Sequence, residues 1–186
     1  MSPADEYFLK ICLLGSPDSL KHTILRAFVK LKPTSDYRFP GLAISNFRFS
    51  VDSIYVKLSI VTIANKQYFE QFSLKNPDIK NTTDLRSSYY RGAAGGLVFF
   101  NKCESQSFDE IPGWVEEFQR IIPPPVPLLM VGLSSHSDDC TEPISFIQAQ
   151  TLASQLNLPY METSPTDRQT IYKIFVSLVK QAIDHE

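Results

Sequence analysis

The stretch from Gly15 to Thr23 follows a short apolar run and combines a glycine, a lysine and hydroxyl side chains. These are the residue types that hold phosphate groups. In a phosphate-binding loop, glycines let backbone N–H groups approach the phosphates, a lysine supplies positive charge, and a serine or threonine hydroxyl binds Mg²⁺. Gly15 and Lys21 have the spacing of that pattern. The candidate nucleotide-binding residues of this loop are therefore Gly15, Lys21 and Thr23.

Other residues of the same stretch depart from the pattern. Leu20 replaces the second glycine and adds a branched side chain where close backbone approach is required. Pro17 removes an N–H donor, and Asp18 adds a negative charge. His22 takes the place of the Mg²⁺-binding hydroxyl, and Thr23 comes one position late. A hard cation prefers oxygen to imidazole, so we expect this loop to be unfit for a magnesium-bound triphosphate.

Residues of this kind allow three roles other than binding a magnesium-bound triphosphate. Lys21 could bind a phosphate or a carboxylate, or could be a solvated or Asp18-paired lysine at the start of a helix. His22 and His136, with Cys140 nearby in sequence, could hold a metal, but the spacing matches no zinc pattern. A hydrolase would need a nucleophile elbow of the type G-x-S-x-G, which the sequence lacks. We therefore predict no metal site and no catalytic residue.

Composition limits the function further. The chain has 186 residues, 43% of them hydrophobic, and a formal net charge of −2, which disfavours a nucleic-acid partner. No apolar run approaches the ~20 residues of a membrane span, and the acidic N-terminus does not resemble a signal peptide. Cys12, Cys103 and Cys140 form no CxxC pair, so reduced thiols and a cytoplasmic location are expected.

Apolar runs that end at turn residues predict strands, and apolar residues spaced by three and four predict helices. The antiparallel pair joined by residues 51–53, followed by strands that alternate with helices, predicts a mixed, mostly parallel six-stranded sheet with helices on both faces. We expect a single domain over 1–186 with its core at about 7–183. The expected strands are 7–14, 42–50, 54–63, 96–100, 128–131 and 158–163, the expected helices are 20–31, 109–122, 143–156 and 168–184, and 65–83 is expected to be a long loop or a broken helix.

Several runs, in one order, resemble those of a known family. Residues 88–93 read Ser-Tyr-Tyr-Arg-Gly-Ala, Ser107-Phe108 precede Trp114 by a short interval, and residues 159–164 read Pro-Tyr-Met-Glu-Thr-Ser. With the strand 56–60, they resemble Ras-superfamily small GTPases, most closely the Rab branch, over about residues 7–183. The resemblance implies a three-layer α/β fold of the phosphate-loop NTPase (Ras-like) type. It also adds Thr163 and Ser164 to the candidate nucleotide-binding residues, on the side of the guanine base.

The remaining family motifs are degenerate in this sequence. The switch I threonine corresponds to Leu42, the Mg²⁺-associated aspartate of switch II to Thr62, and the water-positioning glutamine to Lys66. The guanine-reading aspartate corresponds to His136. Because phosphoryl transfer depends on positioning and electrostatics, we predict a pseudo-GTPase without GTP turnover, in which Leu20 and Ile63 fill the space of phosphates and Mg²⁺. No cofactor is expected.

The predicted function is a non-catalytic interaction module or complex subunit in intracellular trafficking or signalling. The alternative is an atypical small GTPase that still binds GTP or GDP weakly. No cysteine follows Cys140, so no prenyl anchor is expected and any membrane recruitment would be through a partner. Large apolar side chains in the switch-like stretch could bind a protein partner or could plug the vacant pocket. The candidate partner-binding residues are Phe39, Leu42, Ile44, Phe47, Tyr68, Phe69 and Phe72.

Overall fold

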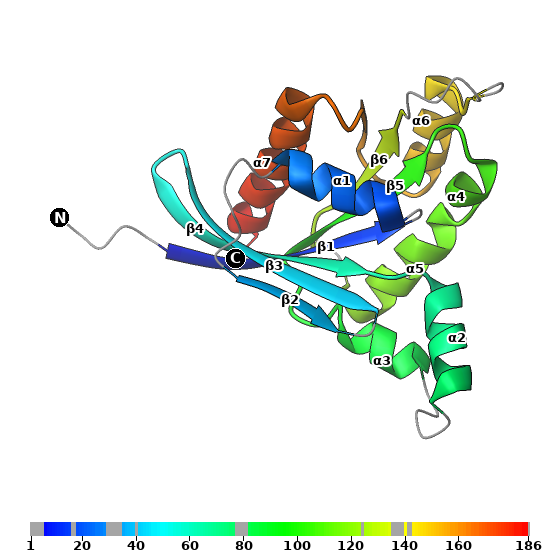
Figure 1. Cartoon of the computed structure of the whole chain (residues 1–186). Coiled ribbons are helices and arrows are strands. Elements are labelled where there is room, and N and C mark those ends of the chain that lie inside the picture. Colours follow the sequence, from blue (N-terminus) through cyan, green and yellow to red (C-terminus); the bar gives the residue numbers. More distant parts are fainter. Residues whose placement is uncertain are drawn as a thin grey trace.

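The computed structural model describes residues 6–15, 18–28, 35–39, 41–76, 82–123, 125–134, 140 and 143–185; within these ranges the side chains of 18–20, 35–39, 66 and 82–84 are left out. The described chain forms one mixed sheet with helices on both faces (Figure 1). In chain order the elements are β1 (Glu6–Gly15), α1 (Asp18–Phe28), β2 (Ser35–Phe39), β3 (Leu42–Val51), β4 (Ile54–Ile63), α2 (Lys66–Lys75), α3 (Thr82–Ser88), β5 (Gly95–Asn101), α4 (Ser105–Asp109), α5 (Ile111–Ile121), β6 (Leu128–Leu133), α6 (Phe146–Gln155), β7 (Tyr160–Thr163) and α7 (Arg168–Asp184).

The strand order is β2-β3-β4-β1-β5-β6-β7. β1 pairs in parallel with β4 and β5, and β6 and β7 continue the parallel part. β2, β3 and β4 form the antiparallel edge. The predicted mixed, mostly parallel α/β fold is confirmed, but the sheet of the described residues has seven strands rather than the six we predicted. The added strand is β2, a short segment between Pro33 and Pro40. Its sequence contains no apolar run, which is why it was not predicted to be a strand.

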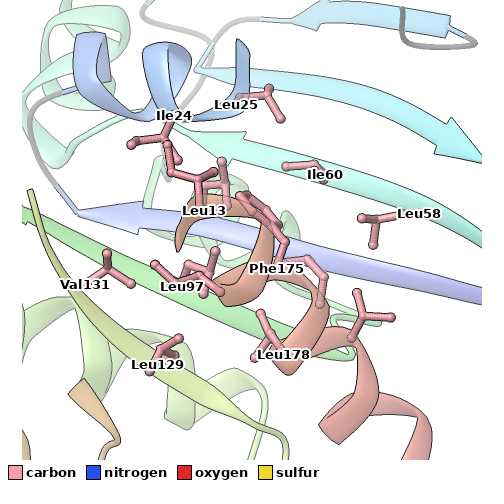
Figure 2. Packing of buried hydrophobic residues seen from close by; sticks show 14 of the residues in the cluster. Leu13, Ile24, Leu25, Leu58, Ile60, Leu97, Leu129, Val131, Phe175 and Leu178 are labelled. Carbon is pink, nitrogen blue, oxygen red and sulfur yellow. The ribbon is translucent and has the colours of Figure 1, made fainter. Parts of the chain in front are cut away.

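Two apolar layers hold the helices to the sheet, because successive strand residues point to opposite faces. On one face, α1 and α7 cover residues such as Leu13, Leu58 and Leu97 (Figure 2). Phe175 and Leu178 of α7 lie in the centre of this layer. On the other face, α2, α5 and α6 cover a layer that includes Trp114 and Phe118. Each residue of the buried strand β5 before Asn101 is inaccessible to solvent, as its continuous apolar sequence predicts.

Local signals explain several element boundaries. The polar stretch 65–83 contains α2, which Asn65 caps by accepting a hydrogen bond from the backbone N–H of Tyr68, and the beginning of α3. A broken helix was one of the two predictions for this stretch, and its residues 77–81 lie outside the described residues. α6 begins at a capping box, in which Ser145 and Gln148 satisfy each other's backbone N–H groups. The helix predicted at 109–122 is in fact preceded by the separate short helix α4.

Candidate functional site

Gly15 ends β1 at the carboxyl edge of the sheet, where the first candidate nucleotide-binding loop begins. Its φ is +90°, and a Cβ built there would lie 1.9 Å from the carbonyl oxygen of Phe99 in β5. Any larger residue would collide with the neighbouring strand and would also adopt a strained backbone. The close packing of β1 against β5 is therefore sufficient to require this glycine, without any phosphate nearby.

The Lys21 side chain turns inward from α1 and is inaccessible to solvent. Its Nζ donates to the carbonyl oxygen of Gly15 at 2.6 Å and to that of Ile63 at 2.7 Å. The ammonium group therefore joins the end of β1 to the end of β4. The solvated lysine that the sequence allowed is not what the structure contains, and the side chain of Asp18, its other possible partner, lies outside the described residues. Hydrogen bonds from a charged donor contribute about 1.5–3 kcal/mol each.

Trp114 of α5 lies beside this lysine and beside a second buried cation. Lys21 Nζ is 5.3 Å from the Trp114 ring centroid, and Arg86 Cζ is 4.2 Å from it. Arg86 pairs with Glu117 at 2.9 Å, and the hydroxyl of Tyr90 donates to the same carboxylate at 2.9 Å. Burial raises the pKa of Tyr90. The structure thus connects Tyr90 and Trp114, both from motifs that resemble the family's, to a buried ionic network.

Arg86 and Glu117 were not among the sequence-predicted site residues. A signal did exist: Arg86 stands four residues before Tyr90, and Glu117 three residues after Trp114, so each lies one helical turn or so from a motif residue. Charged residues in exposed helices follow the same spacing, however, so the sequence gives no reason to place these two inside.

Thr62 and Ile63 stand at the end of β4, where the family resemblance places the aspartate that supports Mg²⁺. Thr62 is 5% exposed, and its hydroxyl oxygen makes no hydrogen bond within the described part of the chain. Ile63 is fully buried in the apolar layer on the α5 face. The side chain of Leu20, which we predicted to fill the phosphate and Mg²⁺ space together with Ile63, lies outside the described residues. The described residues contain no cluster of three or more His, Cys, Asp or Glu side chains that could hold a metal ion.

These residues do not fit a magnesium-bound nucleoside triphosphate. The cation that should face the phosphates is bound to two backbone carbonyls, and no carboxylate replaces Thr62 behind the Mg²⁺ position. A neutral hydroxyl cannot supply the charge that a hard divalent cation requires. No chemical step is derived through such a ligand.

The candidate residues on the guanine-base side lie at the end of β7 and directly after it. Thr163, at the end of β7, is buried, and its backbone carbonyl accepts from the N–H of Ser134. The Ser164 hydroxyl is 3.0 Å from that of Thr166. Thr23, in contrast, is exposed on α1. The structure therefore brings Gly15 and Lys21 together at one point of the sheet edge, leaves Thr163 and Ser164 at the end of β7, and does not bring Thr23 to them.

Cys103 and Cys140 form a disulfide with a Cα–Cα distance of 5.3 Å. The expectation that all three cysteines are reduced thiols is therefore wrong for this pair. The bond joins the loop after β5 to the segment that follows β6, because parallel neighbouring strands end at the same edge and bring residues distant in sequence together. Cys12 is a free, buried cysteine, and burial raises the pKa of its thiol to about 12.

Phe69 of α2 closes the corner between the segments that correspond to the two switches. It is 2% exposed, and its ring packs on Gly41, the turn residue before β3. A Cβ at Gly41 would lie 2.4 Å from Phe69 Cζ, and the φ of Gly41 is +71°. The backbone N–H of Ala64 also donates to the Gly41 carbonyl oxygen at 3.0 Å. This corner is therefore fixed by the protein's own side chains.

The candidate partner-binding residues divide into two groups. Phe47 is buried in the layer under α1 and α7. Phe69 is buried in the layer on the α5 face, and Leu42 and Ile44 are half-buried against that layer. Tyr68 is 40% exposed and stacks on Phe72. Leu74, 83% exposed, lies on another side of the same helix, about 120° around its axis from Tyr68, and the sequence did not single it out. The Phe39 side chain lies outside the described residues.

The sheet order, with a glycine at the end of β1 and a lysine at the start of α1, defines a domain of the phosphate-loop α/β class. The Ras family model matches residues 10–184, so the chain belongs to the Ras family. It is 27% identical over 182 residues to the GTP-binding protein ypt1 of Schizosaccharomyces pombe, covering 97% of this chain and 83% of that protein. It is 26% identical over 181 residues to the Ras-related protein RABD2a of Arabidopsis thaliana, covering 96% and 81%.

A third relative is the human Ras-related protein Rab-4A, which is 22% identical over 186 residues, with 99% of this chain and 78% of that protein covered. Among the described residues, no helix has the length and apolar character needed to cross a bilayer.

Proposed function

We propose that this Ras-family chain is a pseudo-GTPase that acts as a protein-interaction subunit in intracellular trafficking or signalling. The observation that carries the proposal is the buried Lys21 ammonium bound to the carbonyls of Gly15 and Ile63. A lysine held in this way acts as an internal cross-link between β1 and β4. The described side chains around it include no metal-binding cluster, and Thr62 and Lys66 stand where the family resemblance places the Mg²⁺-associated aspartate and the water-positioning glutamine needed for phosphoryl transfer.

Thermal unfolding in the presence of nucleotides tests this proposal. A ligand at 100 times its dissociation constant stabilises the folded state by about 2.7 kcal/mol. We expect no rise in melting temperature with GTP, GDP or ATP, with or without Mg²⁺, while the GTP-binding protein ypt1 of Schizosaccharomyces pombe serves as the positive control. A rise with GTP or GDP would instead support the alternative, a weak guanine-nucleotide binder that uses Thr163 and Ser164. GTP hydrolysis above background, abolished in Lys21→Ala, would refute the proposal directly.

The outer surface of α2 is the proposed partner-binding face. Tyr68 and Phe72 present stacked aromatic surface on one side of the helix, and Leu74 presents an exposed apolar side chain on an adjacent side. Aromatic residues dominate interface hot spots. In this proposal, Phe69 holds α2 in place from beneath without a nucleotide, so the face is permanently displayed. The proposed location is the cytoplasm, with recruitment to a membrane or complex by the partner.

Quantitative cross-linking in cells tests the face. The double variant Tyr68→Ser, Leu74→Ser should lose specific cross-linked partners while its unfolding transition stays close to that of the wild type. The matched control is Ile147→Ser, which removes a comparably exposed side chain (77%) from α6 and should keep the partners. Equal cross-linking by the α2 and α6 variants would place the partner elsewhere.

A further inference from the structure

The first half of β1 and the hairpin end of β3 and β4 extend past the helices that cover the lower face of the sheet (Figure 1). The residues of these strands that share one face are set by the register, in which Phe8 pairs with Lys57 and Lys10 with Ser59, while Arg48 lies opposite Lys57 across the antiparallel pair. This part of the sheet, which we call the basic face, is lined by Phe8, Lys10, Asn46, Arg48, Lys57 and Ser59.

The basic face contains a shallow groove of about 340 Å³, which lies within the size range of sites that accept a small ligand or a few side chains. The polar groups at its base are Asn46 and Ser59, whose side chains are hydrogen-bonded to each other. The residues that line it include no acidic side chain. Glu6 lies just outside and pairs with Lys57 at 2.7 Å. The groove is therefore positive, although the whole chain carries a net charge of −2.

The placement of Arg48 is unfavourable for the isolated protein. It stands directly opposite Lys57 in the β3–β4 pair, and like charges in facing positions destabilise a sheet. Lys57 is offset by Glu6 and lies 4.4 Å above the Phe8 ring. Lys10 donates to the carbonyl of Arg91 at 2.8 Å. Arg48 is exposed and forms no ion pair within the described part of the chain. Among the three cations that line the groove, Lys10, Arg48 and Lys57, Arg48 is therefore the one whose charged group is available to bind an external anion.

Aromatic surface adjoins the cations. Phe8 is 66% exposed, and Tyr55, two residues before Lys57 and on the same face of the strand, is 59% exposed. Exposed aromatic side chains beside an unpaired guanidinium group match the composition of protein-interface hot spots, in which Tyr, Trp and Arg are enriched. A purely phosphate-binding site would not need this apolar surface.

We propose that the basic face binds an acidic peptide segment of a partner protein, with a carboxylate on Arg48 and aliphatic side chains against Phe8 and Tyr55. An arginine can bind a carboxylate through two parallel hydrogen bonds. A membrane surface fits less well, because lipid recognition uses clusters of about 4–8 Lys and Arg residues, whereas three cations line this groove and Glu6 already pairs with one of them, Lys57. This surface is separate from the outer face of α2, and the proposal does not depend on the nucleotide site.

An array of synthetic peptides tests the proposal with the purified full chain. The array holds 15-residue peptides that share the same aliphatic positions and carry Glu and Asp, Gln and Asn, or Lys and Arg at the others. We expect enrichment of the acidic set, and we expect Arg48→Glu to weaken the best acidic peptide at least 10-fold by fluorescence anisotropy. The matched control is Arg120→Glu on α5, an exposed charge reversal away from the groove, which should change the affinity less than 2-fold.

Nuclear magnetic resonance identifies where the peptide binds. With the best acidic peptide, the largest amide shift changes should fall on β1, β3 and β4 around Phe8, Asn46 and Lys57. No enrichment of acidic over neutral peptides would overturn the proposal, as would equal losses in the Arg48 and Arg120 variants or shift changes centred on α2. Stronger binding to phosphatidylserine vesicles or to inositol hexakisphosphate than to every peptide would also overturn it, in favour of a phosphate ligand.

Discussion

The chain places its cations differently at two points along the same strands. At the carboxyl ends of β1 and β4, the ammonium of Lys21 is buried and bound to backbone carbonyls. Toward the opposite ends of these strands, Arg48 and Lys57 face each other on an open part of the sheet. The first arrangement uses a charge to hold two strands together, and the second keeps charge available at a cost in stability. At the end that the family resemblance assigns to nucleotide, which we call the Lys21 end, the ammonium group is thus bound to the backbone, whereas the charge of Arg48 lies on an open surface.

The largest expected effect concerns Phe69, which packs on Gly41 near the carboxyl end of β4. Phe69→Ala should lower the free energy of unfolding by about 4 kcal/mol, since it removes a buried ring from its contact with Gly41. Tyr68→Ala, one residue away but 40% exposed, should lower it by about 1 kcal/mol or less. Urea unfolding followed by circular dichroism measures both. Similar losses for the two variants would contradict the distinction between the buried and exposed sides of α2.

The second expected effect concerns the disulfide between Cys103, after β5, and Cys140, after β6. Reducing the Cys103–Cys140 bond, whose residues are 37 apart in sequence, should lower the stability by about 3 kcal/mol, because the reduced unfolded chain gains freedom. Thiol titration checks the pairing. The native oxidised protein should react slowly or not at all, since Cys12 is buried and burial raises the pKa of its thiol to about 12.

After reduction, the native protein should show the Cys103 and Cys140 thiols, and after reduction and unfolding Cys12 should react as well. Rapid reaction of the untreated native protein at Cys103 and Cys140 would show that the bond does not form. The double variant Cys103→Ser, Cys140→Ser is the control, because it should not change stability on addition of reductant.

The third prediction compares the two kinds of cation directly. Lys21→Met should lower the free energy of unfolding by about 2 kcal/mol, since the buried carbonyls of Gly15 and Ile63 lose a charged donor. Arg48→Met should change it by less than about 0.5 kcal/mol, or raise it slightly, because it removes a facing like charge. Chemical unfolding in low salt measures both. Unchanged stability in Lys21→Met would contradict the cross-linking role of the lysine.

The smallest expected effect is a pH dependence at the start of α7. Asp167 caps α7 by accepting from the backbone N–H of Thr170, and this hydrogen bond lowers the pKa of its carboxyl. A lowered folded-state pKa contributes stability above the unfolded-state pKa, and this stability is lost as the pH falls through the folded-state pKa. Asp167→Asn keeps a capping side chain and should lose part of the acid dependence, which stability measurements below neutral pH would detect. An identical pH profile in the variant would contradict it.

Much of the fold could be predicted from the sequence, because its signals are local. The run 96–100, which lies in β5, is continuously apolar, and the helices 109–122 and 168–184 show a wide apolar stripe. Motif order then gave the family, which the match over residues 10–184 shows. β2 was missed because its pairing with β3, rather than its own composition, makes it a strand.

The candidate site could be predicted only in part. The sequence places Lys21 at the start of α1, but whether its ammonium faces solvent, a phosphate or backbone carbonyls depends on how β1 and β4 end beside it. The positions of Arg86 and Glu117 around Trp114, and the proximity of Cys103 to Cys140, are likewise set by contacts between distant segments. The buried and exposed aromatics of α2 alternate within one helical turn, which composition alone does not resolve.

The central claim is that the Lys21 ammonium is bound to the carbonyls of Gly15 and Ile63 and does not face a phosphate. The most direct test observes this ammonium group by ¹H–¹⁵N correlation spectroscopy of the side-chain amines. A buried, hydrogen-bonded ammonium exchanges its protons slowly enough to be seen, whereas solvent-exposed lysines lose their signals by exchange. We expect a Lys21 resonance that disappears in Lys21→Met and does not shift when millimolar GTP and Mg²⁺ are added. A missing resonance, or one that shifts on addition of GTP, would show that the lysine is free to face a phosphate. Either result would contradict the role of Lys21 as an internal cross-link between β1 and β4.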